Sequence, residues 1–358
     1  MTLTQLRTSH ELSARGVVVP PGDLVLSFCM SPYDRMMPLI TGEVKPEGIT
    51  LVFTPVAGPD LFYRQLKFQQ FDLSEMSFSF YLMGRSRNWP YMMLPVFNNR
   101  NFAYTRILVR KAAGIKRPED LKGKRVGNAD YCQSWALWAR GQLEHEFGVK
   151  PEDMIWFQER AEHFSVASTF GWHRPPENVR FQYAETDLGT MFLNGDLDAA
   201  ITYQAGAAMD RPKADLSKDR RFGTIFRDPK AEAIRYYKKH GVYPAQHTTI
   251  IRESIVKEHP WVANSLMDAF NRAKQLAYDR LYERPPSALI FGVEKVRDQR
   301  EIFGDDPFKY GIMANEKMID MVLTYSAEQE LTPKKQPWDE LFPEELLLEE
   351  EKLGLKVH

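Results

Sequence analysis

The chain has 358 residues, which is more than a single hydrophobic core usually serves, so we expect two domains. Its 47 basic and 48 acidic residues give a formal net charge of −1. This balance argues against nucleic-acid and membrane-surface partners, because both select a basic excess.

The N-terminal residues and the cysteines indicate the compartment. Residues 1–22 form an extension before the first predicted strand, and they lack the apolar stretch of a secretory signal. No apolar run approaches the roughly 18 residues that a membrane-spanning helix requires. Cys29 and Cys132 are the only cysteines, which fits a reducing compartment and excludes a disulfide framework. We therefore expect a cytoplasmic protein.

Short apolar runs alternate with longer amphipathic runs along most of the chain. Strands are predicted at residues 24–30, 49–55, 71–76, 93–97, 104–110, 125–129, 154–157, 179–183, 198–203 and 248–252. Helices are predicted at residues 60–69, 133–147, 187–194, 230–240, 260–282 and 315–328. Residues 160–180 interrupt the alternation and indicate a long loop or insertion. The pattern predicts an α/β fold with largely parallel sheets and helices on their faces.

One predicted strand ends in polar residues. Glu75, Ser77 and Ser79 lie within the apolar run 71–81, where a helix should begin. Ligands of open α/β sheets bind beyond the carboxyl ends of strands, so these residues predict a site for a small polar ligand. The alternative is a capped turn that faces solvent.

Two segments indicate a particular α/β architecture. Residues 110–129 (RKAAGIKRPEDLKGKRVGNA) and 191–203 (MFLNGDLDAAITY) resemble the second domain of type 2 periplasmic-binding-protein-like folds. The resemblance implies two α/β domains joined by crossing strands near residues 104–110 and 247–252, with a ligand cleft between them. Domain I would then comprise residues 23–104 and 251–358, and domain II residues 105–250.

A narrower resemblance covers nearly the whole chain. The segments YDRMMPLITGEVKPEGITLVF, FDLSEMSFSFYL, LPVFNNRNF, KRVGNADY, KKHGVYPAQHTTIIRESI and FGDDPFKYGIMANEKMI are similar, in this order, to the 4,5-dihydroxyphthalate decarboxylase family. The resemblance implies a cytosolic enzyme that removes a carboxylate from a dihydroxylated aromatic ring. One departure is Pro32, because family members commonly carry an acidic residue directly before Tyr-Asp-Arg. If that carboxylate took part in proton transfer or bound a metal, this chain would act on another substrate.

Such a reaction needs a general acid for the ring carbon and stabilisation of negative charge in the ring. The catalytic candidates are His247, Glu75 and Asp34. The ordinary pKa of histidine, about 6.5, suits proton transfer at neutral pH, and burial of Glu75 would raise its pKa toward neutrality. Asp34 could accept a proton from a ring hydroxyl. The alternatives are a core histidine for His247 and an ion pair with Arg35 that caps a helix for Asp34.

A second carboxylate on the ring would need a cation, which arginine supplies bidentately. The predicted substrate-binding residues are Arg35, Ser77, Ser79, Arg100, Asn128 and Tyr131. Either serine could instead cap a helix, and Arg100 could lie in a bland surface loop. Asn128 and Tyr131 flank a helix start whose free N–H groups favour an anion, although Asp130 is more readily explained as the cap.

No nucleotide cofactor is expected, because the glycine-rich phosphate-binding motifs are absent. No metal-ligand spacing is visible in the sequence either. Asp34, Glu75 and His247 are scattered in sequence but could come together as ligands in the fold, so the question of a divalent metal stays open. The expected partner is a small aromatic acid, and homo-oligomers stay open. The rival function is a non-catalytic solute-binding protein with the same fold, since fold does not decide function.

Overall fold

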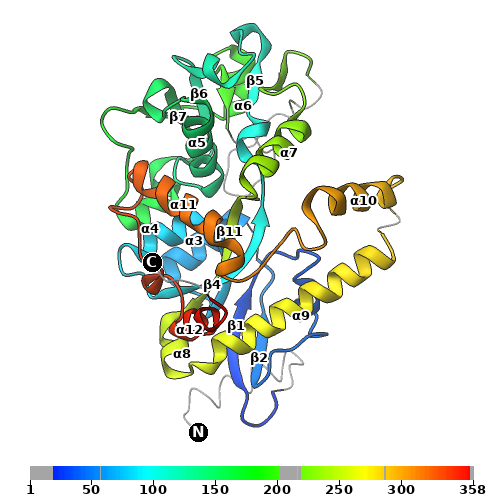
Figure 1. The fold of residues 1–358 in the computed structure, drawn as a ribbon. Helices are drawn as coiled ribbons and strands as arrows, with labels where there is room; N and C mark the ends of the chain where they lie inside the picture. The colour runs from blue at the N-terminus through cyan, green and yellow to red at the C-terminus, as the bar shows by residue number, and fades with distance from the viewer. Residues whose placement is uncertain (1–18, 57, 202–215, 217–218, 286–287, 355–358) are drawn as a thin grey trace.

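The computed structural model describes residues 19–56, 58–201, 216, 219–285 and 288–354. These residues form two α/β lobes, each built on its own β-sheet, and Figure 1 shows one lobe above the other. The predicted α/β, two-domain, type 2 periplasmic-binding-protein-like architecture is confirmed. Within the described ranges, no helix combines the length and apolar character that crossing a membrane requires.

The first sheet has the strand order β2-β1-β3-β11-β4. β1 is parallel to β2 and β3, whereas β11 is antiparallel to β3 and β4. This sheet therefore takes one of its inner strands from a segment far along the chain. Its strands are β1 (Leu24–Cys29), β2 (Ile49–Phe53), β3 (Leu73–Ser77), β4 (Tyr91–Arg100) and β11 (Ala245–Arg252).

The second sheet has the strand order β10-β5-β9-β6-β7-β8. β6 is parallel to β7 and β9, and β7 to β8, whereas β5 is antiparallel to β9 and β10. Its strands are β5 (Leu108–Arg110), β6 (Arg125–Asn128), β7 (Ile155–Gln158), β8 (Arg180–Tyr183), β9 (Ala199–Ala200) and β10 (Phe222–Thr224).

Helices cover both sheets, and the long helix α9 runs across the lower lobe in Figure 1. The helices are α2 (Met37–Ile40), α3 (Gly58–Phe68), α4 (Phe78–Arg85), α5 (Ser134–Phe147), α6 (Leu188–Asn194), α7 (Pro229–His240), α8 (Glu253–Glu258), α9 (Trp261–Glu283), α10 (Gly292–Phe303), α11 (Glu316–Glu328) and α12 (Glu344–Lys352). Short 3-10 turns are η1 (Ala103–Arg106), η2 (Lys111–Ala113), η3 (Pro118–Leu121), η4 (Pro151–Asp153), η5 (Glu162–Phe164), η6 (Val166–Phe170), η7 (Met313–Asn315) and η8 (Trp338–Glu340).

All six predicted helices are present, but the strand predictions need corrections. Both sheets are mixed rather than largely parallel. The chain that returns from the second lobe enters the first sheet in the opposite direction, and in the second sheet β5 is antiparallel to β9 and β10. The strand predicted at 104–110 begins as the 3-10 turn η1, where the Thr105 hydroxyl bonds the Phe102 carbonyl and competes with strand pairing. Of the strand predicted at 198–203, residues 202 and 203 lie outside the described residues.

The C-terminal segment also contacts the second lobe. Helix α11 packs against α5, where the Trp138 and Tyr325 rings meet edge to face with centroids 5.6 Å apart. Gly141 of α5 allows this close approach, because a Cβ at that position would overlap the ring of Tyr325. The domain limits predicted above stay a prediction, since α11 belongs by sequence to domain I but packs on a helix of domain II.

We expect Gly141→Ala to destabilise the protein by about 1–3 kcal/mol, the usual cost of overpacking, although alanine is the better helix former. Urea unfolding at neutral pH measures the change. Gly141→Ala with a free energy of unfolding equal to or above that of the wild type would contradict this account of the α5–α11 contact.

Candidate active site

The central feature is a carboxylate–imidazole pair between neighbouring strands. In the antiparallel ladder of β3 and β11, Thr249 lies opposite Glu75 and His247 opposite Ser77, so Glu75 and His247 are diagonal neighbours. Their side chains meet with 2.5 Å between His247 Nδ1 and Glu75 Oε1. An ionised carboxylate only accepts hydrogen bonds, so Nδ1–H is the donor and Nε2 is the nitrogen left for other chemistry.

Two further donors complete the shell of Glu75, which is fully buried. The Ser31 N–H donates to Oε2 at 2.9 Å, and the Tyr33 hydroxyl donates to Oε1 at 2.8 Å. Burial alone would raise the pKa of Glu75, but the charge and hydrogen bond of His247, together with the bonds from Ser31, hold this pKa below its ordinary value. The expectation that burial shifts Glu75 toward neutrality is therefore wrong, because its partners outweigh desolvation.

Tyr33 is a residue that the sequence analysis passed over. Burial and the neighbouring charge of Glu75 raise the pKa of Tyr33, so its phenol remains a hydrogen-bond donor. The Asn99 amide donates to the Tyr33 oxygen at 3.3 Å, which ties the group to β4. The available signal was the position of Tyr33 beside Asp34 and Arg35 in the quoted motif, although its contact with Glu75 arises only in the fold.

His247 is the accessible member of this group. Its side chain is 21% exposed whereas that of Glu75 is 0% exposed. The ring of Phe62 meets the imidazole edge to face with centroids 4.9 Å apart, which fixes the plane of the ring. In the described part of the chain, Nε2 has no hydrogen-bond partner. Glu75 thus fixes His247 through Nδ1, and Nε2 is the nitrogen that can exchange a proton.

Asp34 and Arg35 form the ion pair of the alternative interpretation, but it does not cap a helix, because Met36 is the N-cap of α2 and no side chain caps it. Arg35 Nη1 lies 2.8 Å from Asp34 Oδ1, and the aspartate is 63% exposed whereas the arginine is 8% exposed. The guanidinium stacks on Phe308 at 3.6 Å and donates to the Asn98 carbonyl at 3.0 Å. Arg35 is therefore a fixed cation, and Asp34 is a counterion with room to move.

Ser77 and Ser79 link the two lobes instead of capping a helix through their side chains. The Ser77 hydroxyl lies 2.8 Å from the hydroxyl of Ser134 at the start of α5, and the Ser134 hydroxyl also accepts the Ser79 N–H at 2.9 Å. Ser79 donates to the Cys132 carbonyl at 2.5 Å. Because Ser77 is paired with His247 across the ladder, these contacts place His247 beside the junction of the lobes.

Three predicted residues or alternatives lie in the second lobe. Asn128 is buried at the end of β6, and its side-chain amide has no partner among the described residues. Tyr131 lies in an aromatic stack, with the Trp172 ring at 5.8 Å and the Arg140 guanidinium at 3.6 Å. Asp130 accepts from the Cys132 N–H at 3.1 Å and pairs with Arg160, but it does not cap α5 as predicted, because the N-cap position is Gln133.

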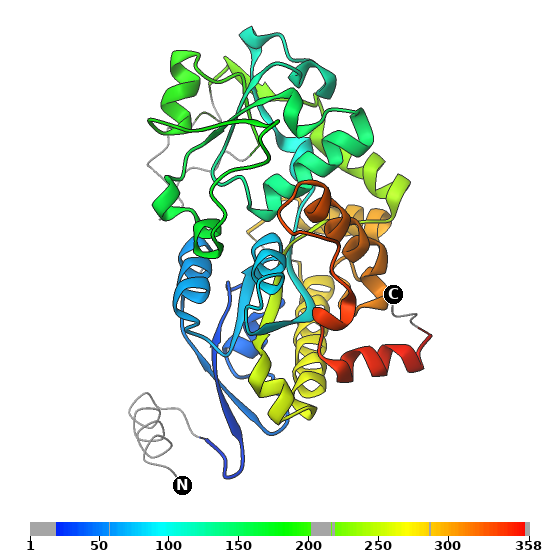
Figure 2. The ribbon, with the colours of Figure 1, turned by 90° about the vertical axis from the view of Figure 1, so that its left-hand side faces the viewer.

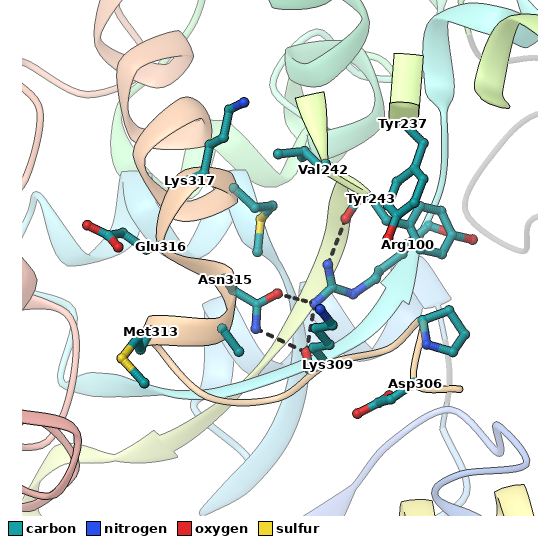
Figure 3. Close-up of a pocket in the computed structure, with 14 residues that line it drawn as sticks. Arg100, Tyr237, Val242, Tyr243, Asp306, Lys309, Met313, Asn315, Glu316 and Lys317 are labelled. Atoms are coloured by element: carbon teal, nitrogen blue, oxygen red, sulfur yellow. Dashed lines mark hydrogen bonds between the residues drawn. The ribbon is translucent and has the colours of Figure 1, made fainter. Parts of the chain in front are cut away.

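Arg100 points into a different environment, shown in Figure 3. Its guanidinium donates to the carbonyls of Tyr243 and Lys309 at 2.7 and 2.8 Å and to the Asn315 side chain at 2.6 Å. The structure thus brings the side chains of Glu75, His247 and Tyr33 into contact. Arg35 is connected to this group because it bonds Asn98, whose neighbour Asn99 bonds Tyr33. Arg100 contacts none of the three and instead bonds Lys309 and Asn315.

Comparison with known proteins places this chain in a family. A 4,5-dihydroxyphthalate decarboxylase of Comamonas testosteroni is 30% identical over 330 residues, which cover 89% of this chain and 96% of the relative. The chain belongs to the 4,5-dihydroxyphthalate decarboxylase family. A decarboxylase of the same name from Pseudomonas putida is 30% identical over 217 residues, covering 60% of this chain and 82% of the relative.

Two further comparisons concern binding proteins. A family model described as an ABC transporter, phosphonate, periplasmic substrate-binding protein matches residues 33–171. The solved structure of the alkanesulfonate-binding protein SsuA from Xanthomonas axonopodis pv. citri, bound to MOPS, has a TM-score of 0.49 and 13% identity, covering 89% of this chain and 96% of SsuA.

Pro32, where the resemblance implies an acidic residue in other family members, is exposed. It lies between Ser31 and Tyr33, both of which donate to Glu75, but contributes no N–H of its own. The described residues contain no group of three or more His, Cys, Asp or Glu side chains placed to hold a metal ion.

We expect Glu75→Gln to lower stability by about 1.5–3 kcal/mol at neutral pH, the usual contribution of hydrogen bonds to a charged group. Because the folded pKa is lowered, the stabilisation from ionised Glu75 is complete above the unfolded value of about 4.3 and is lost as the pH falls through the folded value. Urea unfolding of both proteins from pH 7 to pH 3 should show the difference shrinking on acidification. A difference that stays constant over this range would contradict the lowered pKa.

Proposed function

We propose that this protein catalyses the non-oxidative decarboxylation of a hydroxylated aromatic carboxylic acid such as 4,5-dihydroxyphthalate. The observation that carries the proposal is the partly exposed imidazole of His247, backed by the buried carboxylate of Glu75 and located beside the junction of the lobes. Membership of the decarboxylase family supports the same reaction class.

In the proposed reaction His247 is the general acid. The imidazolium, protonated on both nitrogens, donates the Nε2 proton to the ring carbon that bears the carboxylate. A ring hydroxyl supplies electron density, so the protonated ring is dienone-like. The bond between the ring and the carboxylate then breaks, its electron pair restores the aromatic ring, and carbon dioxide leaves. The neutral imidazole regains a proton from water.

The other residues are proposed to position the reacting groups and to balance their charges. Glu75 is saturated by three donors, so its proposed role is to hold Nδ1 and to balance the imidazolium charge, not to contact the substrate. Arg35 is proposed to bind a substrate carboxylate, with the exposed Asp34 moving aside. Closure of the lobes would exclude water from the site. The cytoplasmic location and the oligomeric state stay predictions.

Purified protein should release carbon dioxide from 4,5-dihydroxyphthalate but not from phthalate, because only the hydroxylated ring can accept electron density as described. Carbon dioxide release and loss of substrate absorbance measure turnover. The model match to a phosphonate-binding protein favours solute binding as the rival function. Saturable binding of both acids with no turnover of either would support that rival and end the enzyme proposal.

We expect His247→Ala to lower kcat by about 10²–10⁴-fold with a smaller effect on substrate affinity, since proton transfer by a positioned side chain contributes that much. His173→Ala is the matched control, because His173 is an exposed histidine whose side chain pairs with the exposed Glu162. A kcat for His247→Ala within a few-fold of wild type would remove His247 from the mechanism.

Asp34→Asn distinguishes a counterion from a proton acceptor. If Asp34 only neutralises Arg35, its loss changes KM and leaves kcat within about tenfold of wild type. The steady-state parameters with 4,5-dihydroxyphthalate decide the matter. A fall in kcat comparable to that of His247→Ala would show that Asp34 takes part in proton transfer.

A further inference from the structure

A second pocket lies where three segments of the chain meet, and its volume is about 220 Å³. Its walls come from Arg100 at the end of β4, from Tyr237 and residues 241–243 before β11, and from residues 306, 307, 309 and 313–318 (Figure 3). Neither Glu75 nor His247 lines it. The pocket is thus distinct from the proposed reaction site, and it borders both connections between the lobes.

Arg100 is a buried cation that makes no direct ion pair with a carboxylate of the described residues. Only 6% of the residue is exposed, and its three acceptors are the carbonyls of Tyr243 and Lys309 and the side-chain amide of Asn315. Its Nε is buried and has no partner among the described residues. Burial lowers the pKa of Arg100 to about 10, as expected for a desolvated positive charge. A buried charge of this kind is stabilised by an anion.

Two lysines add positive charge to the lining. Lys309 is exposed, and its ammonium makes no ion pair or hydrogen bond with the described residues, while Lys317 donates to the His240 carbonyl. Of the acidic lining residues, Asp306 is already bound by Lys274 and Tyr278, which leaves Glu316. The pocket therefore carries an excess of positive charge.

The start of helix α11 adds further positive potential to the pocket. Asn315 occupies the N-cap position but makes no side-chain cap, because its side chain bonds Arg100 and the carbonyls of Lys309 and Gly311. Residues 315–318 line the pocket, so the positive end of the helix dipole faces it together with Arg100.

We propose that this pocket is a second ligand site, which binds a small oxyanion, either inorganic phosphate or the carboxylate of a small acid. Its volume exceeds the cavity of about 150 Å³ that accommodates benzene, so a monocyclic acid fits as well as phosphate. Lys309 and the first turn of α11 are the groups proposed to contact the anion, and the buried charge of Arg100 lies behind them.

Phe308 separates the pocket from Arg35. Its ring stacks on the Arg35 guanidinium at 3.6 Å and meets the Tyr243 ring at 5.6 Å, while its chain neighbours Pro307 and Lys309 line the pocket. The segment 307–309 therefore contacts Arg35 through Phe308 and lines the Arg100 pocket through Pro307 and Lys309.

The test is a direct binding measurement on the intact chain by isothermal titration calorimetry, with inorganic phosphate and benzoate as separate probes. Variants of Arg100 are unsuitable, because its guanidinium supports main-chain carbonyls. The double variant Lys309→Gln/Lys317→Gln removes two exposed charges and should weaken binding of the favoured anion by roughly tenfold. Lys295→Gln is the matched control, since Lys295 is an exposed lysine on α10 outside the pocket.

Binding at the reaction site is distinguished by Asp34→Asn, which removes the exposed counterion of Arg35 and should leave the affinity of the pocket unchanged. Saturable binding of one equivalent that is weakened only by the pocket variant supports the proposal, and the stronger of the two probes identifies the anion. Absence of saturable binding for both probes, equal affinity in the double variant, or a changed affinity in Asp34→Asn overturns it. None of these outcomes depends on decarboxylation.

Discussion

The buried carboxylate of Glu75 is the constraint on which the rest of the candidate site depends. A charge that is fully removed from water must be met by donors, and here a backbone N–H, a phenol and an imidazole meet it. These donors come from the loop after β1 and from β11, which are far apart in the sequence. The same contacts that stabilise Glu75 therefore fix the loop, the tautomer of His247 and the direction of its free nitrogen.

The crossing topology makes this arrangement possible. β11 returns from the second lobe and inserts between β3 and β4. His247, near the start of β11, therefore lies opposite Ser77 at the polar end of β3. The serine contacts between Ser77, Ser79 and Ser134 then join the lobes at the same point. A group located there is sensitive to the relative position of the lobes, which is the property that binding-protein folds use for ligand capture.

Arg35 and Arg100 show how one residue type serves two environments. Both are nearly buried, yet Arg35 has an exposed counterion in Asp34, whereas Arg100 is held by carbonyls and an amide. From the sequence, both are predicted to bind the carboxylates of one ligand, because arginine is the cation suited to that contact. Spacing along the chain cannot show toward which pocket a side chain turns, particularly where the register shifts between His247 and Thr249 disturb the pairing of β4 with β11.

By itself, the sequence determined the fold class, six of the helices, most strands and the family, and it predicted Glu75 and His247 as site residues, because periodicity and strand-end polarity are local properties of the chain. The tertiary structure alone decided the mixed direction of the sheets, the saturation of Glu75 by Ser31 and Tyr33, and the separate pocket of Arg100. It also reversed the expected pKa shift of Glu75. Desolvation follows from burial, which an apolar run indicates, but the compensating charge comes from a residue 172 positions away, which only folding brings into contact.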